Sequence, residues 1–255
     1  MRLQVPSIES MTIVGLTFLL AGFIKGVIGL GLPAVPLAVL TATLGLKPAM
    51  AILLAPSLVT NVWQALVGGH LLAILQRIWP LLLGLCIATW AGIAVLAMSN
   101  AELLAGLLGV VLVGYAVLGL VRLEPPKPGR RLEGWLTPVV GLVSGMLNGM
   151  TGSFVVPGVL YLQALGFSRD ALIQAMGVLF CTSTVALGFA MRGQDFLSLD
   201  LAMLSAAGVV PAVAGMIVGQ VVRQRLSEAA FRTVFFVALL ALGGYIAVRA
   251  LPTFG

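Results

Sequence analysis

The feature that most constrains this chain is an apolar segment interrupted by glycine and proline, which occurs twice in the sequence. The matching positions lie 121 residues apart, and they pair Gly31, Pro36 and Gly45 with Gly152, Pro157 and Gly166. The same interruption therefore recurs at the same spacing in two hydrophobic surroundings. This pattern predicts a duplicated unit with one broken segment in each half.

The composition indicates a protein that spans a membrane several times. The chain is 60% hydrophobic and 9% charged, with a mean hydropathy of +1.15, whereas soluble domains carry about 25% charged residues. The net charge of +6 does not indicate nucleic-acid binding, because the basic residues lie at the ends of hydrophobic segments, as topology signals do. We therefore expect an all-α, polytopic integral membrane protein.

The first apolar stretch, residues 11–46, is too long for one straight crossing. As a single helix it would be about 54 Å long, against a hydrocarbon core of about 30 Å. The glycines and prolines from Gly26 to Pro36 predict where it breaks. Each half then begins with two short helices, over residues 9–25 and 32–46 in the first half and 135–147 and 154–165 in the second.

The other hydrophobic stretches predict three further helices in each half. Their expected ranges are residues 48–67, 78–98, 103–121, 170–191, 197–222 and 228–250. The chain thus divides into a first membrane repeat over residues 1–121, a cytoplasmic linker over 122–134 and a second membrane repeat over 135–255. Each repeat holds about five hydrophobic segments.

The charged linker sets the orientation of the chain. Arg122, Lys127, Arg130 and Arg131 place it in the cytoplasm by the positive-inside rule. Two topologies remain open beyond that point. If each broken pair of helices crosses the membrane once, the two repeats are parallel. If each pair makes two passes or returns to its side of entry, the repeats are inverted. The second basic loop, at Arg223, favours the second case, an inverted pseudo-twofold repeat.

The two breaks are the predicted site of chemistry. Non-helical backbone at membrane depth survives only inside protein or along a watery cavity. Each break precedes a helix N-terminus, near Leu32 and near Phe154, whose free N–H groups favour an anion. Glycine lets a ligand approach the backbone there. The alternative is that pairs such as Gly141 and Gly145 only allow two helices to cross closely.

Polar residues near the breaks complete the candidate site. Lys25 lies inside an apolar run with no acidic residue within fifteen positions, and ionisable residues in membranes are usually functional. Snorkelling of Lys25 to an interface is the competing interpretation. Hydroxyl and amide groups could bind an oxyanion or simply join helices. The candidate binding residues are Lys25, Gly29, Gly31, Asn61, Gln64, Asn148, Thr151, Gly152, Ser153 and Thr182.

Several other classes of function find little support. The eight acidic residues all fall at expected helix ends or loops, so no buried carboxylate relay is expected. One histidine and two distant cysteines, Cys86 and Cys181, predict neither a metal site nor a disulfide. No catalytic constellation is evident. We expect no cofactor, no catalytic residues and no enzymatic activity.

Three stretches resemble a known family. They are FIKGVIGLGLPAVPLAVL (residues 23–40), PAMAILLAPSLVTNVWQAL (48–66) and GLVSGMLNGMTGSFVVPGVLYLQALG (141–166). Together with the duplication, they make nearly the whole chain similar to the TauE/SafE sulfite exporter family of bacterial membrane permeases. Many members have denser glycine runs at the first break than Gly26, Gly29 and Gly31 provide here, which leaves the substrate open.

The resemblance implies a multi-pass permease of the bacterial inner membrane that exports a small anion, with sulfite or an organosulfonate favoured. Transport by alternating access between the two repeats is the corresponding mechanism. The expected partners are that anion and the lipid bilayer, without nucleic acid, and a homodimer is left open. The alternatives are a membrane-embedded enzyme acting on a sulfur compound, with Cys181 as its candidate residue, and a non-transporting assembly or delivery factor.

Overall fold

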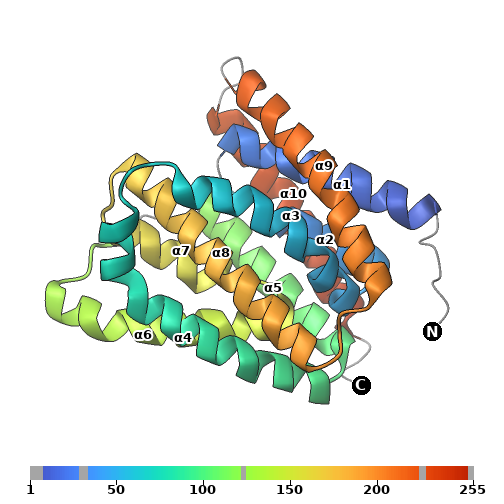
Figure 1. Cartoon of the computed structure of the whole chain (residues 1–255), viewed down its shortest axis with the longest axis horizontal. Helices are drawn as coiled ribbons and strands as arrows, with labels where there is room; N and C mark the ends of the chain where they lie inside the picture. Colours follow the sequence, from blue (N-terminus) through green and yellow to red (C-terminus); the bar gives the residue numbers. More distant parts are fainter. Residues whose placement is uncertain (1–7, 29–33, 122–124, 224–227, 252–255) are drawn as a thin grey trace. The chain divides into compact units, whose positions relative to one another are not determined.

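The computed structural model describes residues 8–28, 34–121, 125–223 and 228–251. Within these ranges the chain folds into ten α-helices and no strand (Figure 1). The helices are α1 (Ile8–Ile28), α2 (Ala34–Leu44), α3 (Leu46–Leu66), α4 (Leu71–Met98), α5 (Ala101–Val121), α6 (Arg130–Thr151), α7 (Val155–Ala164), α8 (Arg169–Gly193), α9 (Leu199–Val222) and α10 (Glu228–Arg249). All ten segments expected from the sequence are present.

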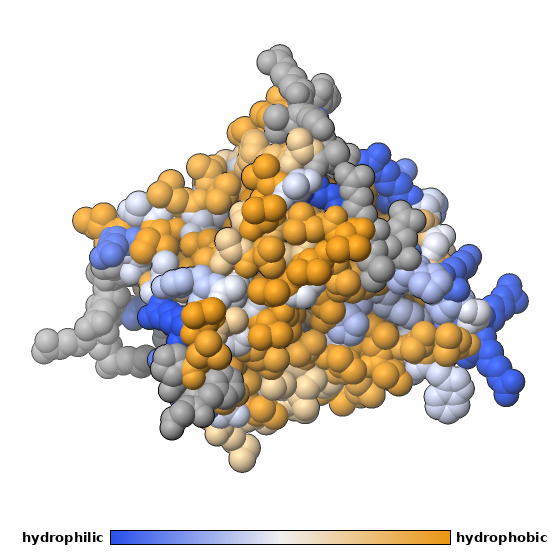
Figure 2. Space-filling view, turned by 180° about the vertical axis from the view of Figure 1, so that it is seen from behind, coloured by the Kyte–Doolittle hydropathy of each residue, from blue (hydrophilic) through white to orange (hydrophobic). Residues whose placement is uncertain are grey.

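Seven of these helices are long and apolar enough to cross a membrane, and α2 and α7 are shorter apolar helices. Many large hydrophobic side chains are exposed, among them Leu72, Val210 and Val234. Figure 2 shows hydrophobic residues dominating the surface in that view. Such a surface is stable against lipid and would be unfavourable in water. The all-α polytopic membrane architecture is thus confirmed.

The aligned glycines Gly45 and Gly166 occupy equivalent turns between helices in the two halves. Gly45 separates α2 from α3 with φ +90°, and Gly166 lies between α7 and α8 with φ +68°. Both angles fall in the left-handed region that favours glycine. The match supports the sequence duplication, while the inverted orientation of the repeats stays a prediction.

The helices form two compact units, and each unit draws helices from both sequence halves. Unit 1 comprises Met1–Ser57, Asn100–Val121 and Asp195–Gly255, and unit 2 comprises Leu58–Ser99 and Arg122–Gln194. In unit 1, α1 packs along α9 and α5 packs along α10. In unit 2, α4 packs along α6 and against α8 (Figure 1). Sequence repeats and compact units therefore do not coincide.

Glycines set how closely the long helices approach one another. In unit 2, a Cβ at Gly141, Gly145 or Gly149 of α6 would collide with backbone carbonyl oxygens of α4, at Leu81, Leu85 and Thr89 respectively. In unit 1, Gly22 and Gly26 of α1 approach the backbone of α9 just as closely. The crossing interpretation of these glycines is therefore correct.

This packing corrects the expected extent of the second break. The sequence predicted a helix over residues 135–147, then a break, then a helix from residue 154, but α6 continues to Thr151 and α7 begins at Val155. Gly145 and Gly149 remain helical because α4 packs against them. The interruption runs from Gly152 to Val156, because Val156, although inside the bounds of α7, has the extended angles φ −112° and ψ 123°. Helix α6 also begins five residues earlier than expected, at Arg130, and α4 begins seven residues earlier, at Leu71.

The first break lies mostly outside the described residues. Helix α1 continues to Ile28 and α2 begins at Ala34. Gly29, Gly31 and the expected helix start at Leu32 fall in residues 29–33, which the structure does not describe.

Candidate functional site

The interruption between α6 and α7 is held by local hydrogen bonds. Gly152 ends α6 in the left-handed conformation, with φ +74°, and its N–H donates to the carbonyl oxygen of Asn148 at 2.7 Å. The hydroxyl of Thr151 accepts from the backbone N–H of Ser153 at 3.2 Å and donates to the carbonyl of Leu147 at 2.7 Å. Two of the predicted site residues, Thr151 and Gly152, therefore shape the turn itself.

Asn148 is fully buried one turn before this interruption. Its side-chain Nδ2 donates to Thr89 Oγ1 on α4 and to the carbonyl oxygen of Ser183 on α8, both at 3.2 Å. A carbonyl only accepts, and the Thr89 hydroxyl already donates to the carbonyl of Leu85 at 2.7 Å. Both partners thus require the nitrogen of Asn148 on their side. The orientation of the amide is fixed by three helices.

That orientation leaves the Asn148 Oδ1 atom buried with no hydrogen-bond partner in the part of the chain that the structure describes. The hydroxyls of Ser144, Ser153 and Ser183 are likewise buried without a hydrogen-bond partner in that part of the chain. All four side chains belong to residues at most 1% exposed. We call these four residues the hydroxyl cluster. A buried polar group without a partner costs about 1–3 kcal/mol, so the cluster calls for an occupant that can hydrogen-bond.

The four residues are neighbours by position in unit 2. Ser144 and Asn148 are four residues apart on one face of α6. Asn148 contacts α8 at Ser183, and Ser153 lies in the interruption that follows α6. Ser144 also faces α7, because a Cβ at Gly158 would lie 3.1 Å from its Oγ atom. The cluster thus gathers groups from α6, α8 and the turn, and α7 packs against it at Gly158.

The structure favours Ser183 over the predicted Thr182 as the buried group on α8. Thr182 is half-buried, whereas Ser183 is fully buried and binds Asn148 through its carbonyl. A helical pattern could have indicated this. Ala175, Leu179, Ser183 and Leu187 recur every four residues, and all four are buried. They therefore share the inward face of α8.

Helix α3 carries the predicted polar residues Asn61 and Gln64, both of which are buried. Gln64 Nε2 donates to the carbonyl oxygen of Ile173 on α8 at 2.8 Å. In return, Gln174 Nε2 donates to the carbonyl of Ala65 at 2.8 Å, and Gln174 Oε1 accepts from the N–H of His70 at 2.8 Å. Gln64 thus joins α3 to α8, which is the structural use of amides in membranes.

Lys25 lies in unit 1, near the end of α1, and is only 5% exposed. The residue beside it, Gly26, packs against the backbone of α9 at Met216 and Gly219. Lys25 is therefore inside the protein rather than extended along its surface. Burial of a cation at a helix crossing is the placement that a functional lysine predicts.

Neither Cys86 nor Cys181 forms a disulfide, and both are half-buried. Within the described ranges, no group of three or more histidine, cysteine, aspartate or glutamate side chains could hold a metal ion. The chemistry that the hydroxyl cluster offers is hydrogen bonding. Its four residues carry three hydroxyls and one amide oxygen that have no hydrogen-bond partner among the described residues.

Comparison with known proteins agrees with these features. A family model described as "Sulfite exporter TauE/SafE" matches residues 14–246, which is nearly the whole chain. The searches of curated proteins and of solved structures returned no match.

Proposed function

This chain belongs to the sulfite exporter TauE/SafE family, and from that premise we propose that it exports a small anion across the bacterial inner membrane. Sulfite or an organosulfonate is the proposed substrate, and alternating access is the proposed mechanism. Family membership supports an anion permease.

The hydroxyl cluster is the observation that carries the proposal. Ser144, Ser153 and Ser183 each hold a buried hydroxyl that has no partner among the described residues. A bound oxyanion offers several acceptor oxygens and would satisfy all three hydroxyls. Each hydrogen bond to a charged group is worth about 1.5–3 kcal/mol, so such a ligand would bind without needing a full counter-charge at the cluster.

Asn148 restricts the ligand further. Its Oδ1 atom can only accept a hydrogen bond, and the amide cannot reverse because Thr89 and Ser183 hold its nitrogen. The ligand should therefore carry one donor beside its acceptor oxygens. A protonated monoanion such as hydrogensulfite meets both requirements, and fully deprotonated sulfate does not. A substrate that carries its own proton also removes the need for a buried carboxylate relay.

Positive charge is supplied by two further features in this proposal. The regular helical part of α7 follows Val156 at the end of the interruption, and a helix N-terminus is equivalent to roughly half a positive charge. Lys25 is the buried cation of unit 1. We assign Lys25 to the transport path, where it would attract the anion.

The test is efflux from proteoliposomes that contain the purified protein. The panel comprises sulfite, thiosulfate, sulfate, sulfoacetate and acetate, each with and without a pH gradient. We expect saturable sulfite efflux that rises when the interior is acidified, because acid raises the share of hydrogensulfite. Absence of anion flux, with activity only in the presence of another protein, would instead favour a delivery factor.

Two variants localise the site. Ser183→Ala removes one hydroxyl of the cluster and should reduce sulfite efflux. Thr184→Val is the matched control on the next residue, since the Thr184 hydroxyl already donates to the carbonyl of Phe180 at 2.8 Å. Loss of flux in both variants, or in neither, would contradict the assignment of the cluster.

A further inference from the structure

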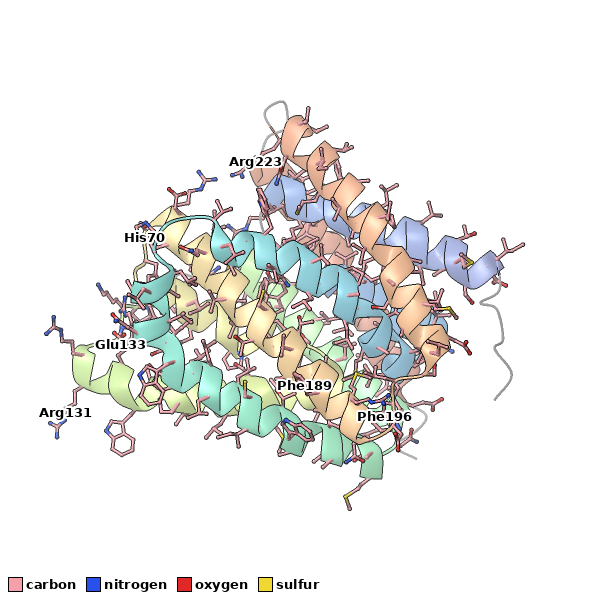
Figure 3. All side chains as sticks on the ribbon, viewed as in Figure 1. His70, Arg131, Glu133, Phe189, Phe196 and Arg223 are labelled. Atoms are coloured by element: carbon pink, nitrogen blue, oxygen red, sulfur yellow. The ribbon has the colours of Figure 1, made fainter. Side chains whose placement is uncertain are left out.

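A second polar site lies in unit 2, at the junction of the linker with α4 and α6. It is a cavity of about 560 Å³, which we call the basic cleft. Its lining residues are Arg77, Pro80, Lys127, Pro128, Arg130, Glu133, Gly134 and Thr137. Figure 3 labels Glu133, with Arg131 beside it at the start of α6. None of these residues belongs to the hydroxyl cluster.

The cleft carries excess positive charge. Arg77 binds Glu133 through two hydrogen bonds, Nε to Oε1 at 2.7 Å and Nη2 to Oε2 at 2.9 Å. The lining thus holds three cations and one carboxylate, a net of 3 − 1 = +2. Glu133 lies on α6, outside the seven candidate spans, and its hydrogen bond to Arg77 lowers the pKa of its carboxyl, with a smaller contribution from Lys127 and Arg130.

The cations are positioned by their surroundings. The Arg77 guanidinium stacks over the Phe167 ring, 4.9 Å from its centroid. The Lys127 side chain runs past Gly166, where a Cβ would lie 3.4 Å from its Nζ atom. Helix α6 begins here with Gly129 as its N-cap and no side-chain cap, so its first backbone N–H groups add to the attraction for an anion.

The rim of the cleft has the character of a membrane interface. Trp79 precedes the lining residue Pro80 and is 58% exposed, and Trp135 follows the lining residue Gly134 and is 75% exposed. Exposed tryptophans concentrate at the level of lipid headgroups. The exposed apolar side chains of Leu83 and Leu132 lie on the same two helices. A ligand of this cleft therefore has one part in the headgroup region and another part against lipid.

We propose that the basic cleft binds the phosphate of an anionic phospholipid headgroup. Arg77, Lys127 and Arg130 match the phosphate charge, and the cavity volume fits a headgroup. The flanking tryptophans match the interfacial position of that group. Basic pockets between membrane helices on the cytoplasmic side bind such lipids in general. This inference does not rest on the proposed transport function.

The experiment uses the full chain in vesicles of phosphatidylcholine with added phosphatidylglycerol. Trp63→Phe and Trp90→Phe leave Trp79 and Trp135 as the fluorescent reporters of the cleft. Quenching by brominated phosphatidylglycerol is compared with quenching by brominated phosphatidylcholine. We expect phosphatidylglycerol to quench at a much lower mole fraction. Equal quenching by the two lipids would overturn the proposal.

Charge variants test the cleft itself. Lys127→Gln and Arg130→Gln should each weaken phosphatidylglycerol binding about fivefold, and together about 30-fold. Arg131→Gln is the matched control, because it removes the same charge from an exposed residue next to Arg130 that does not line the cleft. Glu133→Gln should strengthen binding, which a purely structural role would not do. If Arg131→Gln weakens phosphatidylglycerol binding as much as Arg130→Gln does, binding depends on general surface charge and the proposal is overturned.

A final experiment distinguishes binding of the lipid phosphate from binding of a free anion with the same chemistry. Millimolar inorganic phosphate should leave the quenching by phosphatidylglycerol unchanged. Displacement of the lipid by inorganic phosphate would assign the cleft to a soluble oxyanion and contradict the lipid proposal.

Discussion

Replacing Ser183 with alanine should stabilise the ligand-free protein while weakening transport. In most buried sites, loss of a serine hydroxyl removes a hydrogen bond and destabilises the fold. Here the Ser183 Oγ atom is buried and has no protein partner in the described part of the chain, while its backbone carbonyl still accepts from Asn148. Alanine keeps that backbone contact and removes only the orphaned hydroxyl.

The magnitude follows from the cost of an unsatisfied group. Relief of that cost should raise the free energy of unfolding by about 1 kcal/mol, at the lower end of the usual range of about 1–3 kcal/mol. For a chain of this size, about 1 kcal/mol corresponds to a rise in Tm of about 2–4 °C. Loss of one hydrogen bond to a charged ligand, about 1.5–3 kcal/mol, should weaken sulfite binding by about tenfold or more.

The assay is thermal unfolding in detergent, with and without sulfite, alongside sulfite efflux over a range of concentrations. We expect the variant to have a higher Tm without sulfite, a smaller increase when sulfite is added, and a raised KM. A lower Tm with unchanged efflux would refute the reasoning, because it would show that the hydroxyl has a structural partner.

Three further predictions test the rest of the account. Gly145→Ala should destabilise the protein by about 1–3 kcal/mol, because the new Cβ meets the α4 backbone at Leu85. The control variant Gly134→Ala, which has open space around the new Cβ, should not destabilise it. Thermal unfolding distinguishes the two variants. Gln174→Leu leaves the buried carbonyl of Ala65 and the partly buried N–H of His70 without their partner. The loss at the carbonyl should cost about 1–3 kcal/mol, measured in the same way, and an unchanged Tm would argue against the observed bonds. Lys25→Gln should lower anion efflux about tenfold or more through loss of a charge interaction, and wild-type efflux would remove Lys25 from the transport path.

Much of this fold follows from the sequence because apolar length and glycine position act locally. The segments long enough to span a bilayer appear as helices, and the aligned Gly45 and Gly166 both adopt positive φ. The duplication thus predicts matching turns. A close helix crossing at Gly141 and Gly145 was also foreseeable as one of the two meanings of their spacing, although the partner helix was not.

Other features depend on contacts that no local pattern reports. The sequence alone does not tell whether Gly145 and Gly149 break α6 or let α4 approach. Because α4 packs against them, the interruption begins only at Gly152. The packing of α1 along α9 and of α4 along α6 is likewise set by tertiary contacts. Each unit contains helices from both sequence halves, and hydrophobic periodicity does not indicate this arrangement.

In the candidate site, too, some residues were predictable from the sequence and others were not. Asn148 and Ser153 were identifiable as polar residues beside a predicted break, and the structure places both in the hydroxyl cluster. Ser183 was missed in favour of its neighbour Thr182. The run of three hydroxyl residues alone does not reveal which one faces inward, whereas the four-residue spacing with Leu179 and Leu187 does indicate Ser183. Gln64 was predicted as a ligand contact; its Nε2 atom binds the carbonyl of Ile173, its buried Oε1 atom has no partner among the described residues, and its contact with a ligand stays a prediction.

The most direct test of the central claim is sulfite efflux by an Asn148→Asp variant compared with the wild type in matched proteoliposomes. The substitution preserves side-chain size but places a carboxylate in the hydroxyl cluster, where it would repel an anion and lose the donor bonds to Thr89 and Ser183. We predict that the wild-type protein exports sulfite with saturation and that a folded Asn148→Asp protein does not. Equal efflux by the two proteins would contradict the assignment of this cluster as the anion site.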